Sequence, residues 1–236
     1  MKRLALALQF MTRLPLPVVD ASDEDFAGIM RWLPAAGLVV GVVVAGAAWV
    51  GGHSDIWVGA LCALVAWVAI TGALHLDGLG DIADASGAAH KDRDTLSAVL
   101  ADPHIGSFGV VAITVQLLAK LVLLHAVLDR TSLWVLVLVP AVARIGPLVW
   151  TLTLPPLHEG LGSRFRHGTK WWQIALWAGL LAPIVSFAPA LSAGIGAILL
   201  WGWWLRTRLG GISGDGHGAG IELIETALLC ALAISV

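Results

Sequence analysis

Long apolar stretches dominate this chain, and they limit what it can fold into. Seven stretches of about 17–22 residues have the length that a helix needs to cross a bilayer. Only 13% of all residues are charged, whereas soluble domains have about 25%. We therefore predict an all-α, multi-pass integral membrane helical bundle that occupies residues 1–236 as a single domain. The predicted spans are 32–51, 56–76, 107–128, 133–154, 171–188, 190–206 and 221–236.

The N-terminal segment differs from these spans because its apolar part is too short. Lys2 and Arg3 precede an apolar run from Leu4 to Met11, and no small-residue cleavage site follows it. We expect an interfacial helix here rather than a cleavable signal peptide or a span.

The basic residues indicate the orientation of the bundle. Cytoplasmic loops of membrane proteins carry an excess of Lys and Arg. With the N-terminus placed in the cytoplasm, eleven of the fourteen basic residues fall on the inner side, and Arg130 is the single one outside. We predict a multi-pass protein of the cell (inner) membrane whose N-terminus and three long polar loops, 77–106, 155–170 and 206–220, share the cytoplasmic face. The inner residues are Lys2, Arg3, Arg13, Arg31, Lys91, Arg93, Arg164, Arg166, Lys170, Arg206 and Arg208.

Three aspartates follow the second predicted span at helical spacing. Asp77, Asp81 and Asp84 belong to the segment Leu-His-Leu-Asp-Gly-Leu-Gly-Asp-Ile-Ala-Asp-Ala at 74–85. On an α-helix their side chains fall within an arc of roughly 60°. Carboxylates this close repel one another unless a cation lies between them, and hard oxygen ligands suit Mg²⁺. We predict a catalytic magnesium site; the alternative is a solvated acidic helix start that favours the helix dipole.

A glycine-rich segment forms the second candidate region. Six glycines between Gly210 and Gly220 allow backbone amides to approach an anion closely. Asp215 lies among them, and Glu222 and Glu225 follow near the last predicted span. We predict that Asp215 and Glu222 are further metal ligands, facing the aspartate triad. The alternative is that the glycines are small-residue contacts between membrane helices.

Two cations lie inside predicted spans, where an unpaired charge is costly. We expect the amine of Lys120 to extend toward the outer surface. Arg144 is expected to pair with a phosphate or a carboxylate, and one of the two glutamates is the candidate for a structural pair.

Two polar loops are expected to contact substrate. Asp102-Pro-His-Ile-Gly precedes the third span and contains His104, and the basic segment from Leu157 to Gly168 contains Arg164. The alternative for the basic segment is contact with anionic lipid headgroups.

These motifs resemble those of cobalamin synthase, the adenosylcobinamide-GDP ribazoletransferase family, almost from end to end. The histidine-to-aspartate block is the most specific of them. In this block the family usually has Ala, Thr and Gly where this chain has Gly80, Ile82 and Ala85, but no carboxylate is lost. The matching motifs are Phe10-Met-Thr-Arg-Leu-Pro, Leu33-Pro-Ala-Ala-Gly, His75-Leu-Asp-Gly-Leu-Gly-Asp-Ile-Ala-Asp, Asp102-Pro-His-Ile-Gly, Ala143-Arg, Glu159-Gly-Leu-Gly and Leu209-Gly-Gly-Ile-Ser-Gly-Asp with Glu222 and Glu225.

The resemblance implies a Mg²⁺-dependent transfer of α-ribazole, or its 5′-phosphate, onto adenosylcobinamide-GDP. The products are adenosylcobalamin, or its phosphate, and GMP. A ribose hydroxyl attacks a diphosphate phosphorus, and such a step needs positioning and charge neutralisation. The expected partners are these small molecules and membrane lipid, with no nucleic acid; homo-oligomerisation stays open. The expected catalytic residues are Asp77, Asp81, Asp84 and His75, and the expected substrate-binding residues are Arg13, His104, Arg144, Arg164, Arg206, Arg208, Gly214 and Glu225.

Three other classes use comparable features. A membrane prenyltransferase also binds a diphosphate through aspartates but is expected to carry two aspartate-rich helices. A CDP-alcohol phosphotransferase requires Ala-Arg after Asp-Gly-x-x, where this chain has Asp81-Ile82. A corrinoid transporter needs polar groups along a path through the membrane, whereas polarity here gathers on one face.

Overall fold

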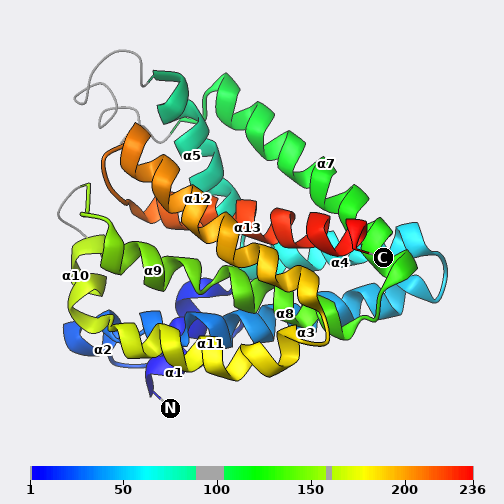
Figure 1. Cartoon of the computed structure of the whole chain (residues 1–236), viewed down its shortest axis with the longest axis horizontal. Coiled ribbons are helices and arrows are strands. Elements are labelled where there is room, and N and C mark those ends of the chain that lie inside the picture. The colour runs from blue at the N-terminus through cyan, green and yellow to red at the C-terminus, as the bar shows by residue number, and fades with distance from the viewer. Residues whose placement is uncertain (1, 89–103, 158–160, 236) are drawn as a thin grey trace.

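The computed structural model describes residues 2–88, 104–157 and 161–235, and every regular element in these ranges is a helix (Figure 1). The predicted all-α bundle is confirmed. The helices are α1 (Lys2–Met11), α2 (Asp23–Ala27), η1 (Met30–Trp32), α3 (Leu33–Gly52), α4 (Ile56–Thr71), α5 (Leu74–Ala88), α7 (Ser107–Arg130), α8 (Trp134–Ala143), α9 (Gly146–Thr153), α10 (Leu161–Gly168), α11 (Trp171–Val185), η2 (Pro189–Ser192), α12 (Ala193–Arg208) and α13 (Gly214–Ile234).

Four helical segments of the described chain are long and apolar enough to cross a membrane. They are Met30–Gly52, Ser107–Arg130, Trp134–Thr153 and Gly214–Ile234, and the bent pair of α4 and α5 is a fifth if it counts as one span. Helices α11 and α12 have 15 and 16 residues, which is short for the roughly 20 that a perpendicular span needs. These helices are consistent with a membrane bundle, and the described residues hold four candidate spans, or up to five, by length and composition.

The predicted span 56–76 is not one continuous helix. The chain turns by 84° between α4 and α5, because α4 ends in a Schellman motif. Gly72, with φ of 61°, donates to the Ala69 carbonyl, and Ala73 donates to the Val68 carbonyl. Glycine adopts this left-handed conformation without steric cost. Ala73, with φ of 59°, adopts the same conformation although it carries a Cβ atom. The turn separates the aspartates from α4 and directs them along a helix of their own.

The C-terminal helix α13 is the centre of the bundle. It packs against α5, α7, α12, α8 and α9, and Figure 1 shows it between α12 and α4. It begins at Gly214 rather than at the predicted residue 221, because the side chain of Ser213 accepts from the Gly216 amide and starts the helix early. Half of the predicted glycine-rich loop is therefore helical and buried.

The N-terminal helix α1 packs on the bundle by its apolar face. Phe10, Phe26 and Phe165 form a cluster of aromatic rings with centroids 5.5–5.9 Å apart, which joins α1, α2 and α10. Lys2 and Arg3 pair with Asp25, and these cations hold the pKa of that carboxyl well below its usual range. A helix is present where the sequence predicted an interfacial one, and it anchors a small layer of helices at one end of the molecule.

The described parts of the predicted polar loops lie at the same end of the molecule. Figure 1 shows the end of α5, the end of α9, the start of α10 and the turn from α12 to α13 at its left. The turns that join α3 to α4 and α7 to α8 lie at the opposite end. The topology therefore gathers the candidate regions on one face.

Candidate active site

Helices α5 and α13 cross in near backbone contact at the candidate site. A Cβ atom on Gly78 would lie 2.9 Å from the Asp215 carbonyl oxygen, and one on Gly218 would lie 3.3 Å from the His75 Cα. Small residues allow membrane helices to approach this closely. The small-residue interpretation therefore applies to Gly218, whose packing holds the start of α13 against the aspartate helix, and anion binding by the glycine-rich segment stays a prediction.

This crossing brings together acids that are far apart in the sequence. The partly buried carboxylate of Asp81 lies within electrostatic reach of Asp215, Asp77 and Asp84. Asp77 and Asp215 also line one pocket of about 210 Å³ between α5 and α13, which we call the α5–α13 pocket. Since like charges in a partly buried place oppose one another, the arrangement favours a bound cation.

Asp84 differs from the other two members of the triad. Its two carboxylate oxygens accept from the Gly106 amide at 2.7 Å and the Gly109 amide at 3.0 Å. Gly106 is the N-cap residue of α7, so the carboxylate satisfies amides that an N-terminus leaves without helical partners. The structure assigns Asp84 a structural contact that the spacing argument did not include.

These acids can bind Mg²⁺ only if a substrate supplies further ligands to the ion. Within the described residues, no three His, Cys, Asp or Glu side chains form a group that holds a metal ion by itself. Mg²⁺ is commonly bound through one or two carboxylates, with water and substrate phosphates as the other ligands. One or two of the carboxylates of Asp77, Asp81 and Asp215 would match that mode.

A second charged cluster lies deeper, between α7, α8 and α13. Lys120 Nζ lies 2.7 Å from Glu222 Oε2 and 2.6 Å from Glu225 Oε2, and Arg144 Nη1 lies 2.9 Å from Glu225 Oε1. All four side chains are at most 3% exposed as residues. Gln116 also donates to Glu222 Oε2 at 2.9 Å. We call Lys120, Arg144, Glu222 and Glu225 the buried charge cluster.

This cluster corrects several predictions from the sequence. Lys120 does not extend to the surface, because two carboxylates hold its amine inside the bundle and the ring of Trp67 lies 4.3 Å from it. Glu222 faces Lys120 rather than the aspartates, so its position does not suit a metal ligand. Glu225 and Arg144 bind one another rather than substrate, and the expected carboxylate pair of Arg144 is confirmed.

The imidazole of His75 lies between the two clusters. Its Nδ1 lies 3.5 Å from Arg144 Nη2, and its Nε2 lies 3.4 Å from Met11 Sδ. Since a guanidinium only donates, Nδ1 is the acceptor and a neutral ring carries its proton on Nε2. The ring is therefore engaged on both sides and is poorly placed to remove a proton from substrate.

His217 lines the same pocket, and the sequence analysis did not select it. The residue is 9% exposed. Its ring stacks on Trp150, its Nε2 lies 3.4 Å from Thr151 Oγ1, and its Nδ1 has no hydrogen-bond partner in the described part of the chain. The available signal was a histidine within a helix of an apolar bundle, since such polar residues usually serve function.

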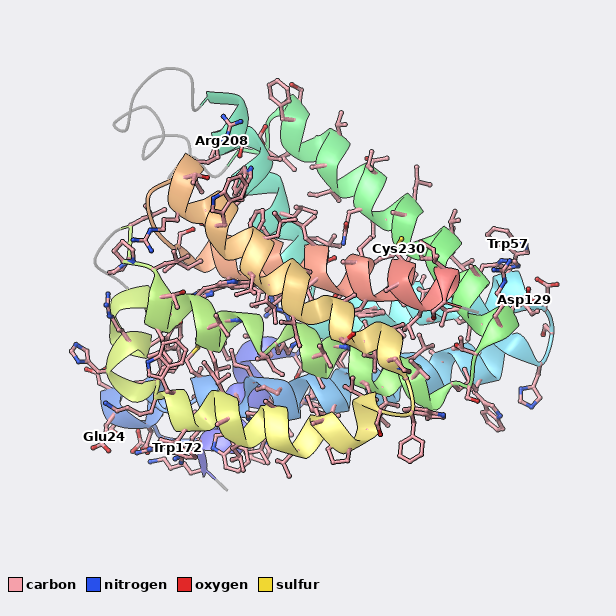
Figure 2. All side chains as sticks on the ribbon, viewed as in Figure 1. Glu24, Trp57, Asp129, Trp172, Arg208 and Cys230 are labelled. Carbon is pink, nitrogen blue, oxygen red and sulfur yellow. The ribbon has the colours of Figure 1, made fainter. Side chains whose placement is uncertain are left out.

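The predicted substrate-binding arginines and Gly214 differ in where they lie relative to this site. The side chain of Arg13 covers Gly72, at the start of α5. Arg206 and Arg208 are exposed in the last turn of α12, and Figure 2 places Arg208 at the end of the molecule opposite Trp57 and Asp129. Gly214 lines the α5–α13 pocket.

Two further predictions rest on the loops. His104 is exposed beside the N-terminus of α7. The side chain of Arg164 lies outside the described residues, so its role stays a prediction.

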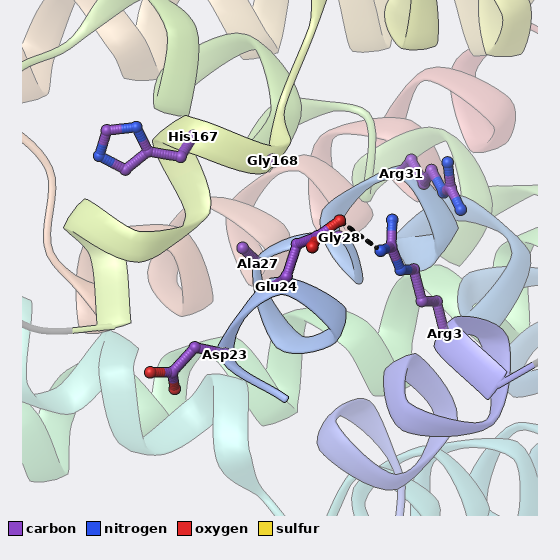
Figure 3. A pocket seen from close by; sticks show the side chains of 8 residues that line it. All are labelled: Arg3, Asp23, Glu24, Ala27, Gly28, Arg31, His167 and Gly168. Carbon is purple, nitrogen blue, oxygen red and sulfur yellow. Dashed lines mark hydrogen bonds and ion pairs between the residues drawn. The ribbon is translucent and has the colours of Figure 1, made fainter. Parts of the chain in front are cut away.

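A larger hollow of about 420 Å³ lies between α1, α2 and α10 (Figure 3). Arg3 already pairs there with Glu24 at 3.1 Å. Figure 3 shows Asp23 and His167 pointing away from this pair rather than converging with it. Because its charges are partly neutralised and diverge, this hollow is a weaker candidate than the smaller pocket beside the aspartates.

The comparisons with known proteins agree on one family. The model of the family described as cobalamin-5-phosphate synthase matches residues 3–233. An adenosylcobinamide-GDP ribazoletransferase of Novosphingobium aromaticivorans is 59% identical, over 100% of this chain and 97% of that protein. Proteins of the same description from Thiobacillus denitrificans and Pseudomonas aeruginosa (strain PAO1) are 49% and 35% identical; they cover 100% and 99% of this chain and 96% and 98% of their own lengths. No solved structure matches the chain.

Proposed function

The chain belongs to the cobalamin-5-phosphate synthase family, and we propose that the acids of α5 and α13 form its active site. The enzyme transfers α-ribazole, or its 5′-phosphate, onto adenosylcobinamide-GDP in cobalamin biosynthesis, with GMP as the second product. The observation that carries the site proposal is the meeting of Asp77, Asp81 and Asp215 from two crossing helices, beside a pocket.

The reaction forms one phosphorus–oxygen bond and breaks another. A ribose hydroxyl of ribazole attacks the cobinamide-side phosphorus, the bond to the other phosphate breaks, and GMP leaves with the electron pair. The hydroxyl proton goes to a carboxylate, for which Asp77 and Asp215 are the candidates because they line the pocket. The protein contributes positioning and charge compensation in such a transfer.

We propose Mg²⁺ as the cofactor, bound through one or two of the carboxylates of Asp77, Asp81 and Asp215 together with the substrate diphosphate. When bound, it would neutralise charge on the diphosphate and on the leaving phosphate. The support is the donor set, three carboxylates that oppose one another in a partly buried place.

We further propose that this face is cytoplasmic and that the protein resides in the inner membrane, in contact with lipid. The support is the sequence count, in which eleven of the fourteen basic residues fall in the segments predicted to be cytoplasmic. Single cysteines in segments 77–106, 155–170 and 206–220, in a chain with Cys62 and Cys230 replaced, should all react with an impermeant thiol reagent from the cytoplasmic side. Reaction of one segment only from outside would contradict this orientation. A homo-oligomer stays open to mass measurement in detergent.

The decisive experiment measures GMP release from adenosylcobinamide-GDP by the purified full-length protein in detergent. Release should require both ribazole and Mg²⁺, and Asp77→Asn should lower its rate. Uptake of labelled corrinoid into vesicles without GMP release would instead support a transporter.

A further inference from the structure

We propose that the α5–α13 pocket receives the planar aromatic base of ribazole and that His217 binds a ring nitrogen of that base. This inference rests on the proposed function and adds the position of one substrate. It is carried by the size and walls of the pocket and by the unpartnered nitrogen of His217.

The size of the pocket excludes the larger parts of the substrates. Its volume is about 210 Å³. A cavity of about 150 Å³ binds benzene, whereas sites for whole drug-sized ligands span about 300–1,000 Å³. A bicyclic ring such as a benzimidazole therefore fits, but a corrinoid or a complete guanine nucleotide does not.

The walls of the pocket suit a flat apolar ring. Phe10, Met11, Met30, Leu33 and Phe165 line one side of it. Aromatic rings and thioether sulfurs both make favourable contacts with an aromatic ligand. These residues come from α1, η1, α3 and α10, so the small N-terminal layer of helices completes the pocket.

His217 supplies a polar contact inside this apolar space. It lines the pocket while its Nδ1 has no partner in the described ranges of the chain. A buried polar atom without a partner is uncommon and needs an explanation. In the proposed bound state the Thr151 hydroxyl donates to Nε2, which leaves the proton on Nδ1. Nδ1–H then donates to the ring nitrogen of the base that carries no sugar.

The position of the acids agrees with this orientation. Asp77, Asp215 and Gly214 line the same pocket as the aromatic walls. With the base against the apolar wall that includes Phe10 and Phe165, the attached ribose lies toward the carboxylates, where its hydroxyl is to lose a proton. One pocket thus accounts for both the binding of the base and the position of the nucleophile.

The first test compares two replacements of His217 in the full-length protein. His217→Phe keeps a ring against Trp150 but removes the donor, and it should raise KM for ribazole about tenfold, the loss of one buried hydrogen bond. His217→Asn keeps an amide donor near the position of Nδ1 and should raise KM for ribazole by only about twofold. The KM for adenosylcobinamide-GDP should stay within about twofold of wild type in both. Equal changes in the two KM values would overturn the assignment.

A second test fills the pocket. An added Cβ at Gly214 meets nothing within 4 Å, and the same holds for Gly46 on the exposed face of α3. Gly214→Leu should raise KM for ribazole, whereas the matched control Gly46→Leu should not. No rise in the first variant, or an equal rise in both, would contradict the pocket assignment.

A third test needs no variant. Free benzimidazole should inhibit the wild-type enzyme competitively against ribazole and not against adenosylcobinamide-GDP; any other pattern overturns the inference. Should the wild-type protein release no GMP, the proposed function fails, and the pocket is still decided by equilibrium dialysis. Benzimidazole should then bind wild type more tightly than His217→Phe, and equal binding would refute the pocket.

Discussion

The bundle contains two groups of acids that meet α13 and differ in how their charge is compensated. In the buried charge cluster, each glutamate has a cation of the protein within 2.9 Å. The other group, which we call the acidic site, consists of Asp77, Asp81, Asp84 and Asp215. The three other carboxylates there all repel the charge of Asp81. Both groups include acids of α13. Asp215 lies near the start of this helix, and Glu222 and Glu225 lie further along it.

This difference separates structural acids from those that we assign to function. Two cations and two carboxylates balance inside the bundle, where an unpaired charge is costly, so the buried charge cluster joins α7, α8 and α13. At the acidic site the protein leaves like charges together, which lowers stability unless a ligand compensates them. Groups of like charges that lower the stability of the fold in this way are typical of functional sites.

The largest effect is expected from breaking the buried charge cluster. Arg144→Ala should destabilise the fold by about 3–5 kcal/mol, because Glu225 loses a partner and stays buried. The measurement is the thermal unfolding midpoint in detergent, with the yield of monodisperse protein as a second readout. Removing Arg144 and Glu225 together as Arg144→Met and Glu225→Leu should restore part of the stability, because the two charges that remain, Lys120 and Glu222, still pair at 2.7 Å. A double variant as unstable as the single one would refute this account.

The opposite result is expected at the acidic site. Asp77→Asn and Asp81→Asn should lower GMP release at least about tenfold, on the order of one lost electrostatic contact in the transition state. Neither should lower the unfolding midpoint, since each change relieves repulsion from Asp215. The same preparations give both measurements. A loss of stability parallel to the loss of activity would place these aspartates with the structural acids.

The sequence could predict the kind of fold and the location of the main acids. Hydropathy identifies α3, α7 and the segment Trp134–Thr153, because apolar length is a local property. The spacing of Asp77 and Asp81, with Asp215 in a glycine-rich segment, likewise identifies carboxylates that the fold brings together.

What the sequence could not predict depends on contacts across the fold. The break at Gly72 depends on left-handed backbone at Ala73 as well, and hydropathy carries no signal for it. The partners of Lys120 lie on another helix, more than a hundred residues away, so its direction could not be read from α7 alone. The contact of His217 with Thr151 likewise comes from another helix, α9, so it could not be read from α13 alone.

Asp84 tests the boundary between the two kinds of acid. Because its carboxylate accepts from the Gly106 and Gly109 amides, Asp84→Ala should destabilise the protein by about 1 kcal/mol, as the loss of a helix cap does. Asp84→Asn keeps acceptor oxygen and should recover part of that loss. Activity should follow stability in this pair, measured as unfolding midpoint and GMP release at a temperature where both variants are folded. A tenfold loss of activity in a fully stable Asp84→Asn would return this residue to the metal site.

The smallest effect is expected at the exposed cations of α12. Arg206 and Arg208 lie in its last turn, Figure 2 places Arg208 at the end of the molecule opposite Trp57 and Asp129, and we expect both arginines to attract the GDP part of the substrate. Replacing either by Ala should raise KM for adenosylcobinamide-GDP only about threefold, because exposed charges contribute about 1 kcal/mol or less. The KM for ribazole should not change, and 0.5 M salt should reduce the difference from wild type. The control is Arg166→Ala, which removes an exposed cation from α10 at the same end. An equal rise in KM for Arg166→Ala would assign the effect to the general charge of this face. A rise confined to the two α12 variants would instead indicate a specific contact of these arginines with a phosphate of the substrate.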